Sequence, residues 1–225
     1  MTAAGRPVAV LFDLDGTLLD TAPDMIHALN TICREEGLAE VPYDRARPYV
    51  SNGAVGLLRL AVPHFDATRD SGLHRRYLQR YAARLAEDTR LFHPLESLLQ
   101  HLESAGVPWG VVTNKPGHLT LPLLQTLGLD RRSACTVSGD TLPERKPHPR
   151  PILFALEQLG LSSAAARAVY VGDARRDIES GRAAGTRTVA VRYGYVEPGQ
   201  DPASWGADHL VGTTIELMNL LTEGW

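Results

Sequence analysis

The apolar run VAVLF, residues 8–12, leads directly into DLDGT, residues 13–17. This order predicts a buried strand that ends in two carboxylates, a glycine and a hydroxyl. Residues two apart on an extended chain point to the same side, so Asp13 and Asp15 can face one site while Leu14 packs away from it. Buried carboxylates cost desolvation energy, which a divalent cation would compensate. The alternative is a strand that ends in a polar turn without any chemistry.

The overall composition excludes several classes of protein. The chain has 225 residues and a net charge of −3. Its length suffices for one large domain or for a domain with an insertion. The charge provides no broad basic field, so no nucleic-acid partner is expected. No window approaches about 18 consecutive apolar residues and no signal peptide precedes the first strand, so we expect no membrane partner.

Cysteine usage indicates a reducing compartment. Cys33 and Cys135 are the two cysteines, and they are too few and too far apart for a disulfide framework or a zinc cluster. We expect both thiols in the core of a cytoplasmic protein.

Hydrophobic spacing predicts alternating strands and helices after residue 90. Apolar runs predict strands at about 107–112, 134–138, 168–171, 188–191 and 208–211, and helical spacing predicts helices at about 94–105, 117–127, 149–159, 175–184 and 213–222. Such alternation is typical of an α/β fold, with a parallel sheet that has helices on both faces.

The stretch between the first strand and residue 90 has a different pattern. Helical spacing is found at about 22–36 and again within 42–88, where prolines and a glycine interrupt it and no strand is convincing. We expect a small, all-helical insertion at this point of the chain.

Polar residues follow four of the predicted strands. Asp13 and Asp15 follow the first, Thr113 and Asn114 the second, Lys146 lies in the loop after the third, and Asp173 and Asp177 follow the fourth. The carboxyl ends of parallel strands share one edge of a sheet, where ligands bind in open α/β folds. Acids, a hydroxyl and a lysine should therefore meet in a single crevice.

These residue types suit phosphoryl transfer. A carboxylate can attack phosphorus and form an aspartyl-phosphate, while a second acid protonates the leaving oxygen and later activates water. Mg²⁺ prefers oxygen ligands that it shares with substrate phosphate, and a hydroxyl and a lysine can neutralise phosphate oxygens. Taken singly, Thr113 could be a locally bonded hydroxyl, Lys146 a surface lysine, and Asp173 and Asp177 acids that favour a helix dipole. Their conjunction favours one site.

With these motifs the chain resembles the haloacid dehalogenase-like (HAD) phosphatases over essentially its whole length. The motifs are Asp13–Thr17, Thr113-Asn114, Lys146-Pro147 and Gly172–Asp177. The resemblance implies a phosphoric monoester hydrolase with a Rossmann-like HAD core, residues 1–17 and 90–225, and a helical cap domain, residues 18–89. The chain departs from the family pattern at Ala174, where many members carry Ser or Thr. This departure puts a secondary hydrogen bond in doubt.

The resemblance also assigns roles to residues. It makes Asp13 the nucleophile and Asp15 the general acid/base, with Thr113 and Lys146 on the phosphoryl group. It implies Mg²⁺ on the Asp13 side chain, the Asp15 carbonyl and Asp173, supported by Asp177. Further residues expected to bind substrate are Asn114, Lys115 and the cap loop Ser51, Asn52 and Gly53, although that loop could also be an ordinary helix start.

Two branches of the family are similar to this chain, one acting on 2-phosphoglycolate and one on N-acetylmuramic acid 6-phosphate in peptidoglycan recycling. The stretches 109–116, 177–182, 184–188, 192–195 and 204–208, most of them outside the catalytic motifs, resemble the second branch. We therefore expect a small phosphorylated metabolite as substrate, preferably N-acetylmuramic acid 6-phosphate, with 2-phosphoglycolate as the alternative. We expect the protein to be a monomer or a homodimer.

Details of substrate recognition stay open. Residues 192–195 could line the crevice between cap and core or form a packed surface loop, and Lys115, Arg59 and Arg192 are candidate partners for a lactyl carboxylate. A phosphosugar mutase shares all four motifs, and a non-catalytic phosphate-binding module is a further alternative that the intact acids disfavour. A dehalogenase would need neither Asp15 nor Asp173.

Overall fold

A computed structural model describes residues 6–223 of the chain, and a six-stranded parallel sheet forms its centre. The strands are β1 (Val10–Phe12), β4 (Trp109–Val112), β5 (Cys135–Val137), β6 (Val169–Gly172), β7 (Arg187–Val191) and β8 (His209–Val211). Their order across the sheet is β5-β4-β1-β6-β7-β8, with Phe12 opposite Val111 on one side and Val171 on the other. The first strand is thus central, and both of its neighbours carry site motifs.

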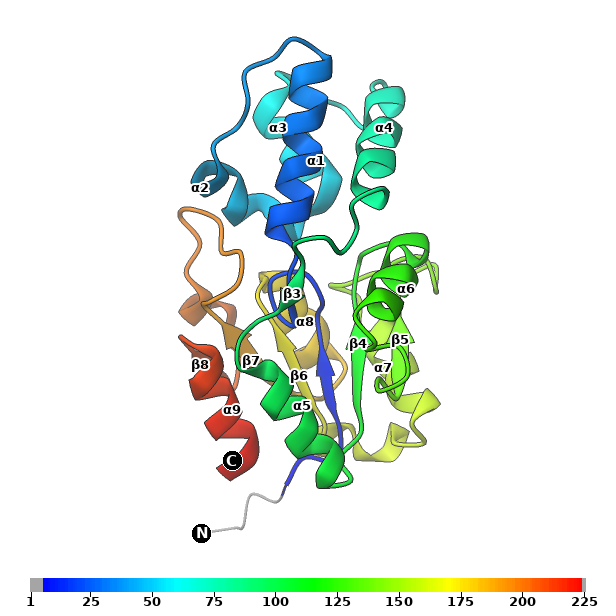
Figure 1. Cartoon of the computed structure of the whole chain (residues 1–225). Coiled ribbons are helices and arrows are strands. Elements are labelled where there is room, and N and C mark those ends of the chain that lie inside the picture. The colour runs from blue at the N-terminus through cyan, green and yellow to red at the C-terminus, as the bar shows by residue number, and fades with distance from the viewer. Residues whose placement is uncertain (1–5, 224–225) are drawn as a thin grey trace.

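Helices cover both faces of this sheet (Figure 1). Val10 and Phe12 face a core formed with α5 (Leu95–Ser104), α6 (Gly117–Thr126) and α9 (Thr214–Glu223). Ala9 and Leu11 face the opposite core, which includes α7 (Arg150–Gln158), and α8 (Arg175–Ala183) packs on β6 and β7. Successive strand residues point to opposite faces, so a strand buried on both sides is apolar throughout, as residues 8–12 are.

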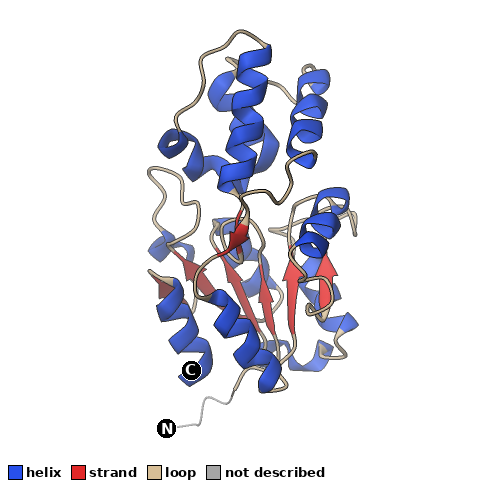
Figure 2. Cartoon of the chain, viewed as in Figure 1, coloured by secondary structure: helices blue, strands red, loops and turns tan. Residues whose placement is uncertain are grey.

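A helical insert, defined here as residues 22–82, stands above the carboxyl edge of the sheet (Figures 1 and 2). It contains α1 (Ala22–Glu35), α2 (Tyr43–Ala46), the 3-10 helix η1 (Arg47–Asn52), α3 (Gly53–Ala61) and α4 (Ser71–Ala82). The insert has its own apolar core, in which Leu29, Leu57 and Tyr77 are fully buried. Because the insert lies over the strand ends, it forms one wall of any site at that edge of the sheet.

Two chain crossings join the insert to the core. A two-stranded antiparallel pair, β2 (Leu19–Asp20) with β3 (Arg90–Leu91), lies at these crossings. Beside them, Tyr195 of the core accepts a hydrogen bond from the backbone N–H of Ala22 (2.9 Å) and donates one to Asp20 (2.6 Å). The insert is therefore held to the core by backbone and side-chain contacts at the crossings.

The predicted α/β fold with a parallel sheet flanked by helices is confirmed, and each predicted strand after residue 90 is found within a few residues of its expected place. The pair β2 with β3 was not predicted, because two residues are too few to show a strand period. The predicted domain boundaries stay a prediction, and residues 1–5 and 224–225 of the predicted core lie outside the described residues. Within 6–223 no helix is both long and apolar enough to cross a membrane.

Asp24, at the start of α1, anchors the second crossing. Its fully buried carboxylate accepts hydrogen bonds from the backbone N–H groups of Asp88 (3.0 Å) and Thr89 (2.8 Å) and from the Thr89 hydroxyl (2.8 Å), and lies 3.2 Å from Nε of Arg84. Removing one partner from a buried polar network leaves the others unsatisfied, which costs more than the bonds themselves contribute.

We expect Asp24→Ala to lower the free energy of unfolding by about 2–4 kcal/mol, because three donors, two of them buried, lose their acceptor. Asp88→Ala is the matched control. The Asp88 side chain is exposed and, within residues 6–223, pairs only with Arg84, so its loss should cost about 0–1 kcal/mol. Urea unfolding of both variants measures the difference, and equal losses would contradict the anchoring role of Asp24.

Candidate active site

A cavity of about 650 Å³ lies between the carboxyl edge of the sheet and the helical insert. Its core wall includes Asp13, Asp15, Thr113, Asn114, Lys115 and Lys146, and its insert wall includes Ser51, Asn52, Gly53, Arg59, His74 and Tyr81. The cavity thus contains all the predicted catalytic residues together with the predicted loop of the insert. Its volume falls in the range typical of small-molecule sites.

Lys146 lies at the centre of the buried charges. Its ammonium group donates hydrogen bonds to Asp13 Oδ1 (2.7 Å), Asp177 Oδ1 (2.7 Å) and the Tyr170 hydroxyl (2.8 Å), and the residue is 4% exposed. Burial lowers the pKa of Lys146, but the charges of Asp13 and Asp177 outweigh burial and raise it overall. The lysine therefore stays cationic and compensates two carboxylates.

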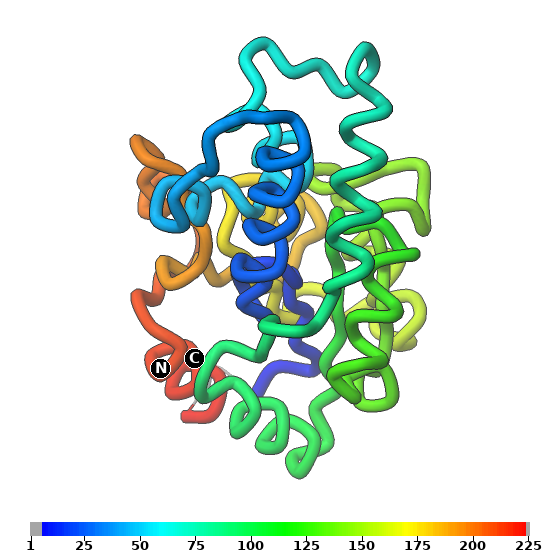
Figure 3. The backbone as a smooth tube through the Cα atoms, turned by 45° about the horizontal axis from the view of Figure 1, so that its top comes forward, coloured from blue at the N-terminus to red at the C-terminus, as the bar shows by residue number. Residues whose placement is uncertain are grey.

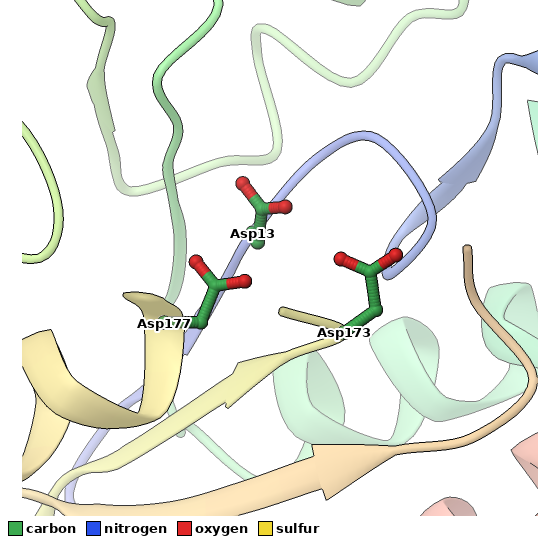
Figure 4. A group of neighbouring side chains, drawn as sticks. All are labelled: Asp13, Asp173 and Asp177. Atoms are coloured by element: carbon green, nitrogen blue, oxygen red, sulfur yellow. The ribbon is translucent and has the colours of Figure 1, made fainter. Parts of the chain in front are cut away.

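Asp173 completes a cluster of three acids (Figure 4). Carboxylate oxygens of Asp13, Asp173 and Asp177 all lie within 4.8 Å of one another. Burial and the charges of Asp13 and Asp177 raise the pKa of Asp173 to about 7. Asp173 Oδ2 accepts hydrogen bonds from the Ser51 hydroxyl (2.7 Å) and the Tyr195 N–H (2.8 Å), whereas buried Oδ1 has no partner.

This donor set fits a divalent cation. Three carboxylates share the cluster, the unpartnered oxygen of Asp173 is buried in it, and of these three acids Lys146 contacts Asp13 and Asp177 but not Asp173. The Ser51 hydroxyl contacts both Asp173 Oδ2 and the backbone carbonyl of Asp15 (3.2 Å), so these two predicted ligands lie around one atom. Oxygen ligands of this type suit Mg²⁺.

Gly16 allows the loop after β1 to approach Asp173. Its φ is 86°, and a Cβ at this position would lie 2.1 Å from Asp173 Oδ2. Both the conformation and the space therefore require glycine. The glycine of the first motif is explained by this close approach.

Asp15 is held by two donors. Its Oδ1 accepts hydrogen bonds from the Thr21 hydroxyl (2.7 Å) and from Lys115 Nζ (2.9 Å). Lys115 Nζ also lies 4.5 Å from the ring centroid of Tyr81, a residue of α4. Lys115 thus connects a core carboxylate with the insert, and its charge is already paired.

Asn114 positions the backbone of Lys146. Its side-chain amide donates to the Lys146 carbonyl (3.0 Å) and accepts from the Lys146 N–H (3.1 Å). The neighbouring Thr113 hydroxyl lies buried beside the cavity and accepts a bond from the Lys115 N–H (3.1 Å). The second motif therefore holds the third motif in place, a role for Asn114 that the sequence did not indicate.

The loop Ser51–Gly53 contacts the core at several points. Besides the bonds of Ser51 to Asp173 and Asp15, the Asn52 amide donates to Glu197 (2.8 Å) and the Arg176 guanidinium donates to the Ser51 carbonyl (2.5 Å). All three loop residues line the cavity. Their predicted contact with substrate stays a prediction, since their visible partners are core residues.

Residues 192–195 do not line this cavity. Arg192 pairs with Asp201 (3.2 Å), the Tyr193 hydroxyl donates to the Thr17 carbonyl (2.9 Å), and Tyr195 contacts the crossings and Asp173. The segment therefore braces the loop after β1. The sequence left open whether residues 192–195 line the crevice or form a packed surface loop, and these contacts agree with a packed loop.

Sequence reasoning missed Tyr170, which lies fully buried within β6. Its hydroxyl donates to the Val112 carbonyl (2.8 Å) and accepts from Lys146. A tyrosine in an otherwise aliphatic run, VYVG, was the available signal, because a buried hydroxyl needs a hydrogen-bond partner.

Comparisons with known proteins agree with this geometry. The family model "Haloacid dehalogenase-like hydrolase" matches residues 10–191. A phosphoglycolate phosphatase of Xanthomonas campestris is 48% identical over 205 residues, 91% of this chain and 92% of its own. An N-acetylmuramic acid 6-phosphate phosphatase of Pseudomonas aeruginosa is 44% identical over 217 residues, 96% and 95% of the two chains. A crystal structure of a predicted phosphoglycolate phosphatase from Haemophilus somnus is 26% identical in sequence and has a TM-score of 0.80. The match covers 92% of this chain and 94% of that chain.

The raised pKa of Asp173 implies a cost of ionisation in the metal-free protein. In the unfolded chain the carboxyl ionises near pH 3.9, whereas in the folded chain its pKa is about 7. Between these two pH values the folded chain keeps a proton on Asp173 that the unfolded chain has lost. The free energy of unfolding therefore falls as the pH rises through 7 and the folded state loses this proton.

We expect Asp173→Asn, in chelator, to raise the free energy of unfolding at pH 8 on the order of 2–4 kcal/mol, because asparagine removes the buried charge. The gain should shrink as the pH falls from 7 towards 4. Urea unfolding across this range measures it. Mg²⁺ should stabilise the wild type at pH 8 and not the variant, and a variant less stable than the wild type at pH 8 in chelator would contradict the prediction.

Proposed function

The chain belongs to the haloacid dehalogenase-like hydrolase family, whose close relatives are phosphatases, and we propose that it hydrolyses a phosphomonoester through an aspartyl-phosphate on Asp13. The observation that carries this proposal is the buried cluster of Asp13, Lys146, Asp173 and Asp177, of which Asp13 and Lys146, together with Asp15, line a cavity large enough for a metabolite.

In the first half-reaction an Asp13 carboxylate oxygen attacks phosphorus. The bond from phosphorus to the leaving oxygen breaks, and Asp15 gives that oxygen a proton, so the alcohol departs neutral. Lys115 and Thr21 hold the Asp15 carboxyl through hydrogen bonds to its Oδ1, which orients it towards the reacting group.

In the second half-reaction Asp15, now a carboxylate, takes a proton from water. The water oxygen attacks phosphorus, the bond to Asp13 breaks, and inorganic phosphate leaves. Lys146 remains charged beside Asp13 throughout, because its pKa is raised. The Thr113 hydroxyl and the Lys146 ammonium group would neutralise the phosphoryl oxygens as charge develops on them.

The fitting cofactor is Mg²⁺, held by the Asp13 side chain, the Asp15 carbonyl and Asp173, with Asp177 in support. When bound, it neutralises charge on the phosphoryl group and on the acids. Without a cation, Asp13, Asp173 and Asp177 repel one another in a buried cluster whose single lysine contacts two of them.

N-acetylmuramic acid 6-phosphate is the substrate that we propose, and cavity size is the main support. A cavity of about 650 Å³ exceeds what a two-carbon acid fills, whereas a hexose with a lactyl group makes use of it. The relative from Pseudomonas aeruginosa carries this substrate in its name. The name of the relative from Xanthomonas campestris favours 2-phosphoglycolate as the second candidate.

We expect Asp13→Asn to abolish phosphate release, since an amide cannot form the acyl phosphate, and Asp15→Asn to lower kcat about 10²–10⁴-fold, as the loss of a general acid/base does. Asp44→Asn, an exposed acid of α2, is the control and should retain wild-type activity. Steady-state phosphate release and a denaturation curve for each variant separate lost chemistry from lost folding. A loss below tenfold in Asp15→Asn would count against its role.

The substrate is tested with a phosphate-release panel of N-acetylmuramic acid 6-phosphate, 2-phosphoglycolate, glucose phosphates and nucleotides. We expect the highest kcat/KM for the first, because it uses the whole cavity, and no turnover after chelation. A preference of tenfold or more for 2-phosphoglycolate, about 1.4 kcal/mol of transition-state binding, would reverse the order of the two candidates. An isomeric product without net phosphate release would indicate a mutase.

A further inference from the structure

The cavity extends away from the acids along two helices of the insert. Helix α3 begins at Gly53, beside the loop that contacts Asp173, and α4 returns the chain towards the core (Figure 3). Arg59 is six residues beyond Gly53, or about 9 Å along a helix with a rise of 1.5 Å per residue. His74 is seven residues before Tyr81 on α4. Both Arg59 and His74 line the cavity.

The charges that line the cavity are unevenly distributed. Among the described residues its acids are Asp13, Asp15 and Glu197, all from the core, and they pair with Lys146, Lys115 and the Asn52 amide respectively. The insert wall contributes no acid. Its remaining members around α3 and α4 are mostly apolar or aromatic: Tyr49, Val55, Leu60, Tyr77, Leu78 and Tyr81.

Arg59 is the charged residue on this wall that has no partner within residues 6–223. Several other arginines of the insert are engaged: Arg76 and Arg80 pair with Glu35 of α1, and Arg47 donates to carbonyls of residues 193 and 194. Arg45 and Arg75 are unpaired within the described residues, but they do not line the cavity. The Arg59 guanidinium, exposed at the cavity, therefore offers a positive charge that the fold itself does not use.

The two other cations considered from the sequence do not have this property. Lys115 is buried, pairs with Asp15 and packs on the Tyr81 ring. Arg192 pairs with Asp201 and does not line the cavity. Of the three, Arg59 alone combines a position on the cavity wall with an uncommitted charge. Arg145 also lines the cavity and has no side-chain partner within residues 6–223, but it belongs to the core and directly precedes Lys146, whereas Arg59 belongs to the insert.

We propose that Arg59 binds a carboxylate of the leaving alcohol, with His74 of the same wall as a second polar contact. The inference rests on the proposed phosphatase function and specifies the substrate class, a phosphomonoester with a carboxylate at the end remote from the phosphoryl group. A guanidinium presents paired donors that match the two oxygens of a carboxylate. Burial lowers the pKa of His74, so the wall carries one positive charge, which suits a monoanion better than a second phosphate.

The position of Arg59 also separates the two candidate substrates. In 2-phosphoglycolate the carboxylate is one carbon away from the ester oxygen, and it stays beside the acids when the phosphoryl group is on Asp13. In N-acetylmuramic acid 6-phosphate the lactyl group is on O3 of the hexose, several bonds farther from the ester oxygen, and we infer that this length lets it reach α3. Arg59 thus selects for the longer acid.

The experiment compares N-acetylmuramic acid 6-phosphate with N-acetylglucosamine 6-phosphate, which lacks only the lactyl group. We expect Arg59→Met to lower kcat/KM for the first about 10–100-fold, mainly through KM, and to change the second less than threefold. Arg59→Lys should recover part of the loss. Arg75→Met, a neighbouring exposed arginine of α4 that does not line the cavity, is the matched control and should alter neither substrate.

Binding is measured separately from turnover. Calorimetry with the Asp13→Asn protein in Mg²⁺, with and without Arg59→Met, gives Kd for both sugar phosphates and for glucose 1,6-bisphosphate. The inference predicts tighter binding of the lactyl compound, lost with Arg59→Met. Equal Kd values for the two N-acetyl sugars would overturn the inference. So would tighter binding of the lactyl compound that persists in Arg59→Met, or a change in Kd on Arg59→Met that is seen only with the bisphosphate. Wild-type protein that binds these sugars without releasing phosphate overturns the proposed function instead.

Discussion

The ammonium group of Lys146 is the interaction on which the site depends. Two carboxylates, Asp13 and Asp177, are buried at the centre of the sheet edge, and burying such charges without a counter-charge costs several kcal/mol per ion. Lys146 contacts both, and Tyr170 and Asn114 hold it from the strand below and the loop beside it. The motifs at four strand ends therefore form one electrostatic unit, because the lysine compensates the two acids that it contacts.

The fold and the core of the site were predictable from local patterns. Apolar runs that end in polar residues indicated strands of a parallel sheet, and a parallel sheet brings its strand ends together whatever the details of packing. For this reason Asp13, Asp15, Thr113 and Lys146 were expected to lie close together, and all four line one cavity, while their roles stay a prediction. These features depend on residue type and spacing, which a sequence displays.

What could not be predicted depends on contacts between distant segments. The bond between Ser51 and Asp173 joins residues 122 positions apart, and the bond of Tyr195 to Asp20 spans 175. The short pair β2 with β3 has too few residues for a period, and it forms because the two crossings meet. In each case the partner is decided by how the insert sits on the core, and no local pattern encodes that.

The attachment of the insert has a consequence for how the chain can evolve. All the acids and Lys146 belong to the core, while Arg59 and His74 belong to a unit with its own apolar core that joins through two crossings. Substitutions on α3 and α4 can therefore accumulate without disturbing the buried charges, provided that Ser51 keeps its contact with Asp173. Descendants of one ancestral enzyme can diversify in the molecules they recognise while inheriting a single, unchanged reaction.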